Sequence, residues 1–303
     1  MLSTPITNLQ GAAFNAPPGN GVVATANLTP GITYRSITVA LAVGTTPASR
    51  AVIAQQVAQV RLLVSGQEVM VTRGAEMVAL NQYFSGAAVD SDGCIDIQFA
   101  RMWGRDDADV LEMALGTSDQ TSVQVEITYA GAGVTITSAS VFWHSSPNPQ
   151  PAGVVRMLRR DSFVGLTGAG EFIKGDLQRD PTARLLAIGI VASAADIALI
   201  TNVRFNIDNV GIINAPMRVL NLRAKSAWPF RVPQDAAASA ALAVIDFTAD
   251  GFGGESLDMS QYGAQQLYLT MSAAPSVSTF PIILEMAGTI PSAPGLTIAR
   301  AGG

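Results

Sequence analysis

The feature that most constrains this chain is a proline-rich segment at its midpoint, because related sequences lie on both sides of it. Pro147, Pro149 and Pro151 alternate with other residues, and proline lacks the N–H group that a sheet ladder needs. Residues 147–153 are therefore predicted to form an extended linker. Short sequences that precede the linker recur after it in the same order, at an offset of roughly 140 to 150 residues. We therefore predict two copies of one domain.

The clearest of these matches joins residues 59–64 to residues 202–207. Both segments run into a small turn, Ser65-Gly66 in the first copy and Asp208-Asn209 in the second. Each match is short, so the argument depends on their common order along the chain. The other matches join residues 31–37 to 181–187, 80–81 to 220–221, 95–97 to 245–247, 123–127 to 267–271 and 141–143 to 284–286.

Alternation of apolar and polar residues predicts the structure of each copy. Residues 95–99 and 123–127 alternate cleanly, which places their apolar side chains on one face of a strand. A copy of about 145 residues has room for about eight strands of 5–6 residues with their loops. Eight strands in two sheets form a jelly roll. The predicted fold is all-β, with two tandem eight-stranded jelly-roll β-sandwiches and short helices in the loops, one of them near Met77, Leu80 and Phe84.

The predicted boundaries follow from the linker and the matches. Residues 31–146 form the first jelly roll and residues 154–290 the second. Residues 1–30 are rich in Ser, Thr, Asn and Pro and lack the pattern of a compact core, so we expect an N-terminal arm. Residues 291–303 form a C-terminal tail.

The charge content indicates a protein that covers much of its surface with partners. Charged residues make up 14% of the chain and hydrophobic residues 49%, whereas about 25% charged residues is typical. A surface so poor in charge favours an obligate oligomer. The net charge is −5 and the chain has two lysines, Lys174 and Lys225. Phosphate backbones are bound through clustered positive charge, so we expect no direct, sequence-specific nucleic-acid binding.

The beginning of the chain and its cysteine content predict a cytoplasmic site of synthesis. Cys94 is the one cysteine, so the chain cannot form an internal disulfide. The first residues lack the charged and apolar regions of a signal peptide. The longest apolar run, residues 185–200, is shorter than the ~20 residues of a membrane-spanning helix.

Candidate catalytic and metal-binding residues are few. His144 is the single histidine, so an imidazole metal cluster or a Ser-His-Asp triad would depend on it, and we expect no enzyme. Asp90, Asp92 and Asp96 resemble the start of a calcium loop, but Arg101 stands where an EF-hand needs glutamate. A hairpin turn is the alternative for these residues. The acids at positions 106, 107 and 109 are typical of a helix start rather than of a glycosidase.

Arg156, Arg159 and Arg160 form the one basic cluster of the sequence. Two interpretations stay open for it. The cluster faces the headgroups of anionic lipid on the inner face of an assembly, or it makes ion pairs within or between subunits.

The ordered series of segments resembles a known family. The segments that carry the resemblance are residues 32–34, 60–66, 157–163, 180–188, 203–208 and 284–288. In this order they are similar to the double jelly-roll major capsid proteins of tailless, membrane-containing bacteriophages of the corticovirus type. The resemblance spans most of the chain, from about residue 30 to residue 290.

This resemblance implies a major capsid protein. Such proteins form homotrimers whose six jelly rolls make a pseudo-hexagonal capsomer, and the capsomers tile an icosahedral shell over an internal lipid membrane. The implied partners are further copies of the chain, penton and minor capsid proteins, and the membrane or its proteins. The implied location is the virion, assembled in the cytoplasm of a bacterial host. Some members bind calcium between capsomers, and no other cofactor is implied.

Two alternative functions stay open. A minor capsid or spike protein of the same virus would differ in copy number per virion, and a spike usually shows fibrous repeats. A glycan-processing hydrolase with two jelly rolls needs a groove where acids and aromatic rings converge. Trp103, Trp143 and Trp228 are scattered along the chain, which counts against such a groove.

Overall fold

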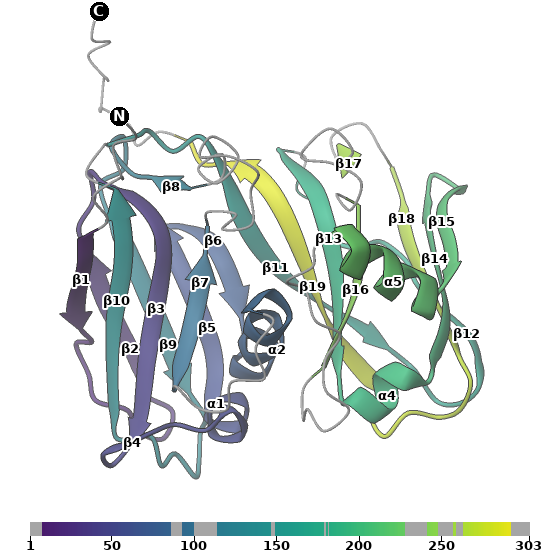
Figure 1. Cartoon of the computed structure of the whole chain (residues 1–303), viewed down its shortest axis with the longest axis horizontal. Coiled ribbons are helices and arrows are strands. Elements are labelled where there is room, and N and C mark those ends of the chain that lie inside the picture. The colour runs from purple at the N-terminus through teal and green to yellow at the C-terminus, as the bar shows by residue number, and fades with distance from the viewer. Residues whose placement is uncertain are drawn as a thin grey trace, which may run out of the picture. The chain divides into compact units, whose positions relative to one another are not determined.

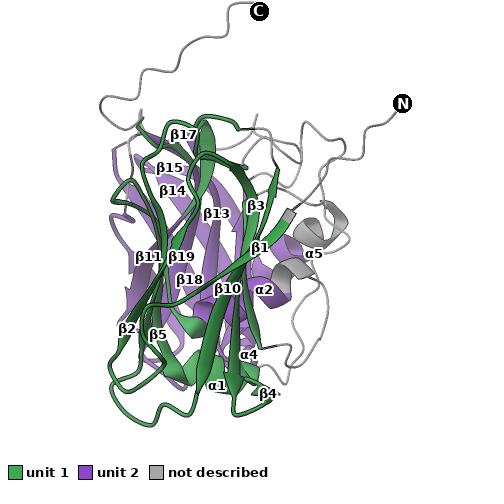
Figure 2. Ribbon diagram, turned by 90° about the vertical axis from the view of Figure 1, so that its left-hand side faces the viewer, with its two compact units in different colours: residues 1–74, 90–157, 288–303 green, residues 75–89, 158–287 purple. Residues whose placement is uncertain are grey.

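The computed structural model divides the chain into two compact units, coloured separately in Figure 2. Unit 1 contains residues 1–74, 90–157 and 288–303, and unit 2 contains residues 75–89 and 158–287. The structure describes residues 8–85, 93–99, 114–146, 149–178, 180, 182–227, 241–247, 257–258 and 263–291.

The strands of unit 1 form two antiparallel sheets (Figure 1). In one sheet, β3 pairs with β10 along one edge, and β8, β7 and β4 pair with successive stretches of its other edge. β1 pairs with the free edge of β10. The members of this sheet are β1 (Asn8–Ala13), β10 (Ser138–Ser146), β3 (Thr33–Val43), β4 (Thr46–Pro47), β7 (Cys94–Gln98) and β8 (Leu115–Gly116). The other sheet has the order β2 (Val23–Leu28), β9 (Val123–Tyr129), β5 (Val57–Val64) and β6 (Gln67–Thr72).

The strands that follow along the chain repeat this arrangement. One sheet has the order β11 (Val154–Val164), β19 (Thr279–Thr289), β13 (Ala183–Ala192) and β16 (Ala241–Asp246), with the short β17 (Leu257–Asp258) also on β13. The other has the order β12 (Gly170–Lys174), β18 (Gln265–Met271), β14 (Ile200–Ile207) and β15 (Val210–Pro216). Apart from the first residues of β11 and the last of β19, all of these strands lie in unit 2.

When the eight longer strands of each set are numbered 1 to 8 along the chain, both sets show the same two strand orders. One sheet reads 1-8-3-6 and the other reads 2-7-4-5 in both sets. Two four-stranded sheets with these orders are a jelly roll. The predicted fold class is therefore confirmed. We call β1–β10 the first roll and β11–β19 the second roll, and we name the sheets of each by these orders.

The helices repeat as well. α1 (Arg50–Gln56) and α4 (Ala194–Ala198) both connect the third strand to the fourth, and each begins at a serine whose hydroxyl accepts a backbone N–H bond. α2 (Gly74–Ser85) and α5 (Met217–Ala227) both connect the fifth strand to the sixth. Every pair of segments that the sequence matched across the linker lies in equivalent elements of the two rolls.

The hairpin between the fourth and fifth strands shows how closely the copies agree. Ser65 and Gly66 have φ of 48° and 78°, and Asp208 and Asn209 have φ of 48° and 67°. A two-residue hairpin with both central residues at positive φ matches the twist of the flanking strands. Gly, Asn and Asp tolerate this backbone conformation best, which explains why these small residues recur at the same place.

Burial follows the alternation that the sequence showed. β9 and β18 alternate between buried and half-buried residues from end to end. In the 1-8-3-6 sheet of unit 2, by contrast, consecutive residues of β13 and β16 are buried, as expected for a sheet covered on both faces. Within unit 2, α4 and α5 pack against β16.

The predicted N-terminal arm over residues 1–30 is wrong for the part of it that the structure describes. β1 pairs with β10 along its whole length, and β2 pairs with β9. Ala24, Ala26 and Leu28 are buried in the core. Alanine contributes little to a hydrophobic pattern, but its small side chain fits where a sheet packs closely. The polar composition of this segment reflects the outward faces of two strands.

The described part of the linker, residues 149–153, is not a free spacer. The Ser118 N–H donates to the Gln150 carbonyl (3.0 Å), and the Ala152 N–H donates to Asp119 Oδ1 (2.8 Å). A Cβ at Gly116 would collide with the carbonyl of Pro151. These contacts hold the proline-rich segment against unit 1, so this unit extends beyond the predicted boundary at residue 146.

The carboxylate of Asp119 is therefore predicted to stabilise the chain. Asp119 is 1% exposed, and its loss leaves the Ala152 N–H without this acceptor. Asp119→Ala should lower the free energy of unfolding by about 1–3 kcal/mol, measured by urea denaturation at one protein concentration. Asn27→Ala is the matched control, because the Asn27 carboxamide makes an exposed side-chain hydrogen bond with Gln124. Equal unfolding midpoints for both variants would contradict the prediction.

Asp196 is a second buried carboxylate, at the start of α4. It is 3% exposed and accepts hydrogen bonds from the Ser276 backbone N–H (2.7 Å), the Ser276 hydroxyl (2.6 Å) and the Ser193 hydroxyl (2.8 Å). Desolvation on burial raises the pKa of Asp196, but these hydrogen bonds outweigh it and leave the pKa below its ordinary value of 3.8. The carboxylate thereby joins α4 to the connection between β18 and β19.

The lowered pKa of Asp196 predicts a pH-dependent contribution to stability. A group whose pKa is lowered by folding stabilises the protein above its unfolded pKa, and this stabilisation is lost as the pH falls through the folded pKa. Asp196→Asn should therefore be about 1–3 kcal/mol less stable than the parent at pH 7. The difference should shrink as the pH falls below about 4. Urea unfolding at a series of pH values checks this, and a difference independent of pH would refute it.

Candidate assembly surfaces

Two members of the predicted basic cluster make contacts inside the chain. Arg156 is 8% exposed, and its Nη1 donates to the Gln98 carbonyl (2.8 Å). Arg160 Nε lies 2.8 Å from Glu76 Oε1, and the Glu76 side chain is 1% exposed. Arg160 thus makes an ion pair within the chain and Arg156 donates to a backbone carbonyl, and both interpretations of the cluster stay predictions. Arg159 is half-buried, and its role toward lipid stays a prediction.

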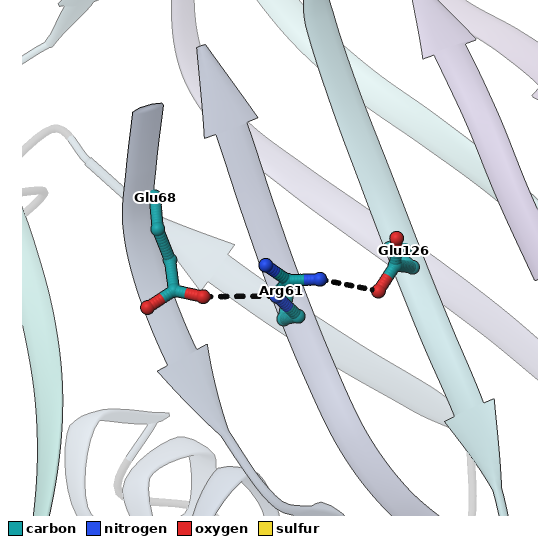
Figure 3. A network of polar contacts seen from close by, with 3 residues as sticks. All are labelled: Arg61, Glu68 and Glu126. Carbon is teal, nitrogen blue, oxygen red and sulfur yellow. Dashed lines mark hydrogen bonds and ion pairs between the residues drawn. The ribbon is translucent and has the colours of Figure 1, made fainter. Parts of the chain in front are cut away.

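A different arginine organises the outer face of the 2-7-4-5 sheet in the first roll. Arg61 on β5 pairs with Glu68 on β6 (2.9 Å) and with Glu126 on β9 (2.8 Å), so that one guanidinium bridges three strands (Figure 3). The hydrogen bonds that Arg61 donates, first to Glu126 and then to Glu68, raise the pKa of Arg61. All three side chains are partly exposed, with Arg61 at 30%, so we expect a modest gain in stability.

The second roll has an arginine at the equivalent position but different neighbours. Arg204 on β14 lies opposite Tyr268 on β18, as Arg61 lies opposite Glu126. Its guanidinium carbon is 3.9 Å from the centre of the Tyr268 ring, and Nη2 is 2.9 Å from Glu171 Oε2. Cation–π contact here replaces one of the two ion pairs. The two rolls thus keep the arginine while their outer faces differ in charge.

The predicted calcium residues are only partly within the described chain. Asp90 and Asp92 lie outside it. Asp96 accepts hydrogen bonds from the Thr38 hydroxyl (2.8 Å) and from the Gln98 carboxamide (2.7 Å). The described residues contain no group of three or more metal-ligating side chains. Calcium binding stays a prediction.

Most of the other sequence candidates lie outside the described residues. His144 is exposed on β10, opposite Leu9 of β1 and Ser36 of β3. The acids at 106, 107 and 109 lie outside the described residues, as do Trp103 and Trp228. Among the described helices, none is long and apolar enough to cross a membrane.

Exposed apolar side chains gather at places that sequence reasoning did not locate. On the 1-8-3-6 sheet of the first roll, Leu9 is 65% and Phe142 is 39% exposed. In unit 2, β15 and α5 carry four more, which are Val210, Ile212, Val219 and Leu222. Apolar residues at outward strand positions indicate such patches. The sequence alone does not identify these positions, because it does not show which face of a strand points inward. Patches of this kind mark interaction sites.

The comparisons with known proteins agree with the fold. Residues 13–140 match the family model described as the viral coat protein P2 N-terminal domain. The major capsid protein P2 from bacteriophage PM2 superposes with a TM-score of 0.72 at 17% identity, over 94% of this chain and 98% of that one. No curated protein matches the sequence.

Two further solved structures come from viruses of other hosts. A chain of the Sulfolobus turreted icosahedral virus has a TM-score of 0.67 at 12% identity, over 94% of this chain and 91% of that one. A chain of the PBCV-1 virus capsid has a TM-score of 0.61 at 10% identity, over 93% and 95%. At these identities the likeness establishes the fold. With the family match, it confirms the predicted resemblance to double jelly-roll major capsid proteins.

The contacts of Arg160 and Arg61 predict different costs for losing each guanidinium. Arg160→Leu removes the ion pair of the buried Glu76 carboxylate and should cost about 3–5 kcal/mol of stability. Arg61→Leu, the matched control, breaks partly exposed pairs and should cost about 1 kcal/mol. Urea denaturation of both variants checks the difference. If Arg160 served mainly to contact lipid, Arg160→Leu would reduce binding to anionic vesicles and leave the unfolding midpoint unchanged.

Proposed function

We propose that this chain is the major capsid protein of a virus, because residues 13–140 match the viral coat protein P2 N-terminal domain and both rolls have the strand order of a jelly roll. The observation that carries the proposal is the repetition of one topology within one chain. Three copies of such a chain supply six similar rolls, which is what a pseudo-hexagonal tile requires. We propose homotrimers of this kind that tile an icosahedral shell.

The surface chemistry supports assembly. With 14% charged residues and exposed apolar side chains on both rolls, the chain gains more by burying surface than by remaining a monomer. Obligate interfaces of about 2,000–5,000 Å² are apolar in the same way. Contacts between capsomers can be individually weak, because each capsomer is held by several neighbours at once.

We propose a structural rather than enzymatic role, in the virion. The proposed partners are other copies of the chain, penton and minor capsid proteins, and an internal membrane or its proteins. Assembly would take place in the cytoplasm of a bacterial host.

Molecular mass in solution tests the proposal directly. Purified chain should sediment at three times the mass of 31.5 kDa, and multi-angle light scattering should give the same value. The mass should be constant over a tenfold dilution, since an obligate interface of this size keeps its subunits together. A stable monomer at micromolar concentration would overturn the proposal.

A further inference from the structure

The repeated helices α2 and α5 allow one contact inside the chain to be compared with its counterpart. Both helices connect the fifth strand of their roll to the sixth, and the sequence match of residues 80–81 with 220–221 aligns them. On one face the two helices agree. Met77 and Met217 are 2% and 4% exposed, and Leu80 and Leu220 are 5% and 8% exposed.

The other face of the two helices differs sharply. Val78, Ala79 and Gln82 of α2 are 7%, 0% and 8% exposed. Their aligned counterparts on α5 are exposed: Arg218 is accessible, and Val219 and Leu222 are 46% and 65% exposed. At two of these positions the exposed residue is the larger apolar one, because Val219 stands for Ala79 and Leu222 for Gln82, whereas Arg218 stands for Val78.

One contact of α2 is made outside the first roll. Although α2 follows β6 of the first roll along the chain, residues 75–89 belong to unit 2. Its Glu76 pairs with Arg160 on β11, the first strand of the second roll. The first turn of α2 is therefore joined by an ion pair to the first strand of the second roll. An equivalent contact for α5 can be made by the first strand of another copy.

The first strand of the first roll has the surface that this contact needs. β1 is an edge strand among the described residues, since it pairs with β10 alone. Leu9 lies opposite His144 and Gly11 lies opposite Phe142, so all four share the outer face of the sheet. The Phe142 ring lies over Gly11, where an added Cβ would be 2.8 Å from Cδ1. The result is an exposed apolar surface at the edge of this sheet.

We propose that α5 of one copy packs against β1 and β10 of a second copy, with Val219 and Leu222 against Leu9 and Phe142. This inference rests on the proposed assembly and identifies the surfaces that make it. The two surfaces differ, so the contact is heterologous, and heterologous contacts form closed rings when their rotation permits. Pro216 stands where α2 has Glu76, so the contact between copies lacks that ion pair and is held by apolar burial.

Charge substitutions on either surface test the proposal. Val219→Asp with Leu222→Glu, and separately Leu9→Asp with Phe142→Asp, should each convert the oligomer to a monomer in sedimentation velocity. Val277→Asp is the matched control, because Val277 is 50% exposed on the connection between β18 and β19, and it should leave the mass unchanged. Circular dichroism and the unfolding midpoint of each variant establish that it is folded. Folded variants of both surfaces that keep the parent mass would overturn the inference.

Mixing the two variants distinguishes this heterologous contact from a symmetric contact between two α5 helices. Each variant retains one intact surface, so an equimolar mixture can form one α5–β1 contact and should yield a species of two chains that neither variant forms alone. If α5 instead packed against α5 of another copy, the Leu9 and Phe142 variant would remain an oligomer by itself, and the inference would fail. If the parent protein were itself a monomer, the proposed function would fail instead, so the two failures are distinguishable.

Discussion

The structure depends on pairing the first strand of each roll with its last. β1 pairs with β10 residue by residue, from Asn8 against Ser145 to Ala13 against Ser140, and β11 neighbours β19 in the same way. This pairing completes the 1-8-3-6 sheet of the first roll, with β1 at its edge. Burial of Val141 and Trp143, and exposure of Phe142 between them, follow from that one register, because successive side chains point to opposite faces.

Much of this fold could be predicted from the sequence, and the residues show why. Strands such as Val123–Tyr129 alternate strictly, and the turns at Ser65 and Asp208 carry residues that tolerate positive φ. β2 could not be found, because Ala24 and Ala26 give almost no hydrophobic signal although both are fully buried. Glu76, the partner of Arg160, lies on α2, and Glu126, one partner of Arg61, lies on β9, both at sequence distances that no local pattern spans. The sequence pattern does not distinguish the exposed Leu222 from a buried leucine.

Because the chain contains two copies of one topology, each residue of one roll can be compared with its equivalent in the other roll. Where both rolls have the same surroundings, their residues agree, as Met77 and Met217 do. Where the surroundings differ, the residues have diverged, as Glu126 and Tyr268 have beside equivalent arginines. A difference in exposure between equivalent residues thus indicates a difference in neighbours, and it can be read without any second protein.

The pairing of β1 with β10 also has a consequence for synthesis. β1 is made before its partner β10, which ends at Ser146, so the first sheet stays incomplete until the whole first roll has been made. At ~5–20 residues per second this leaves apolar strands waiting for several seconds or more. Non-local β pairing is also intrinsically slow. The growing chain therefore passes through a period in which β3 lacks the strand that later pairs with one of its edges, before any strand of the second roll has been made.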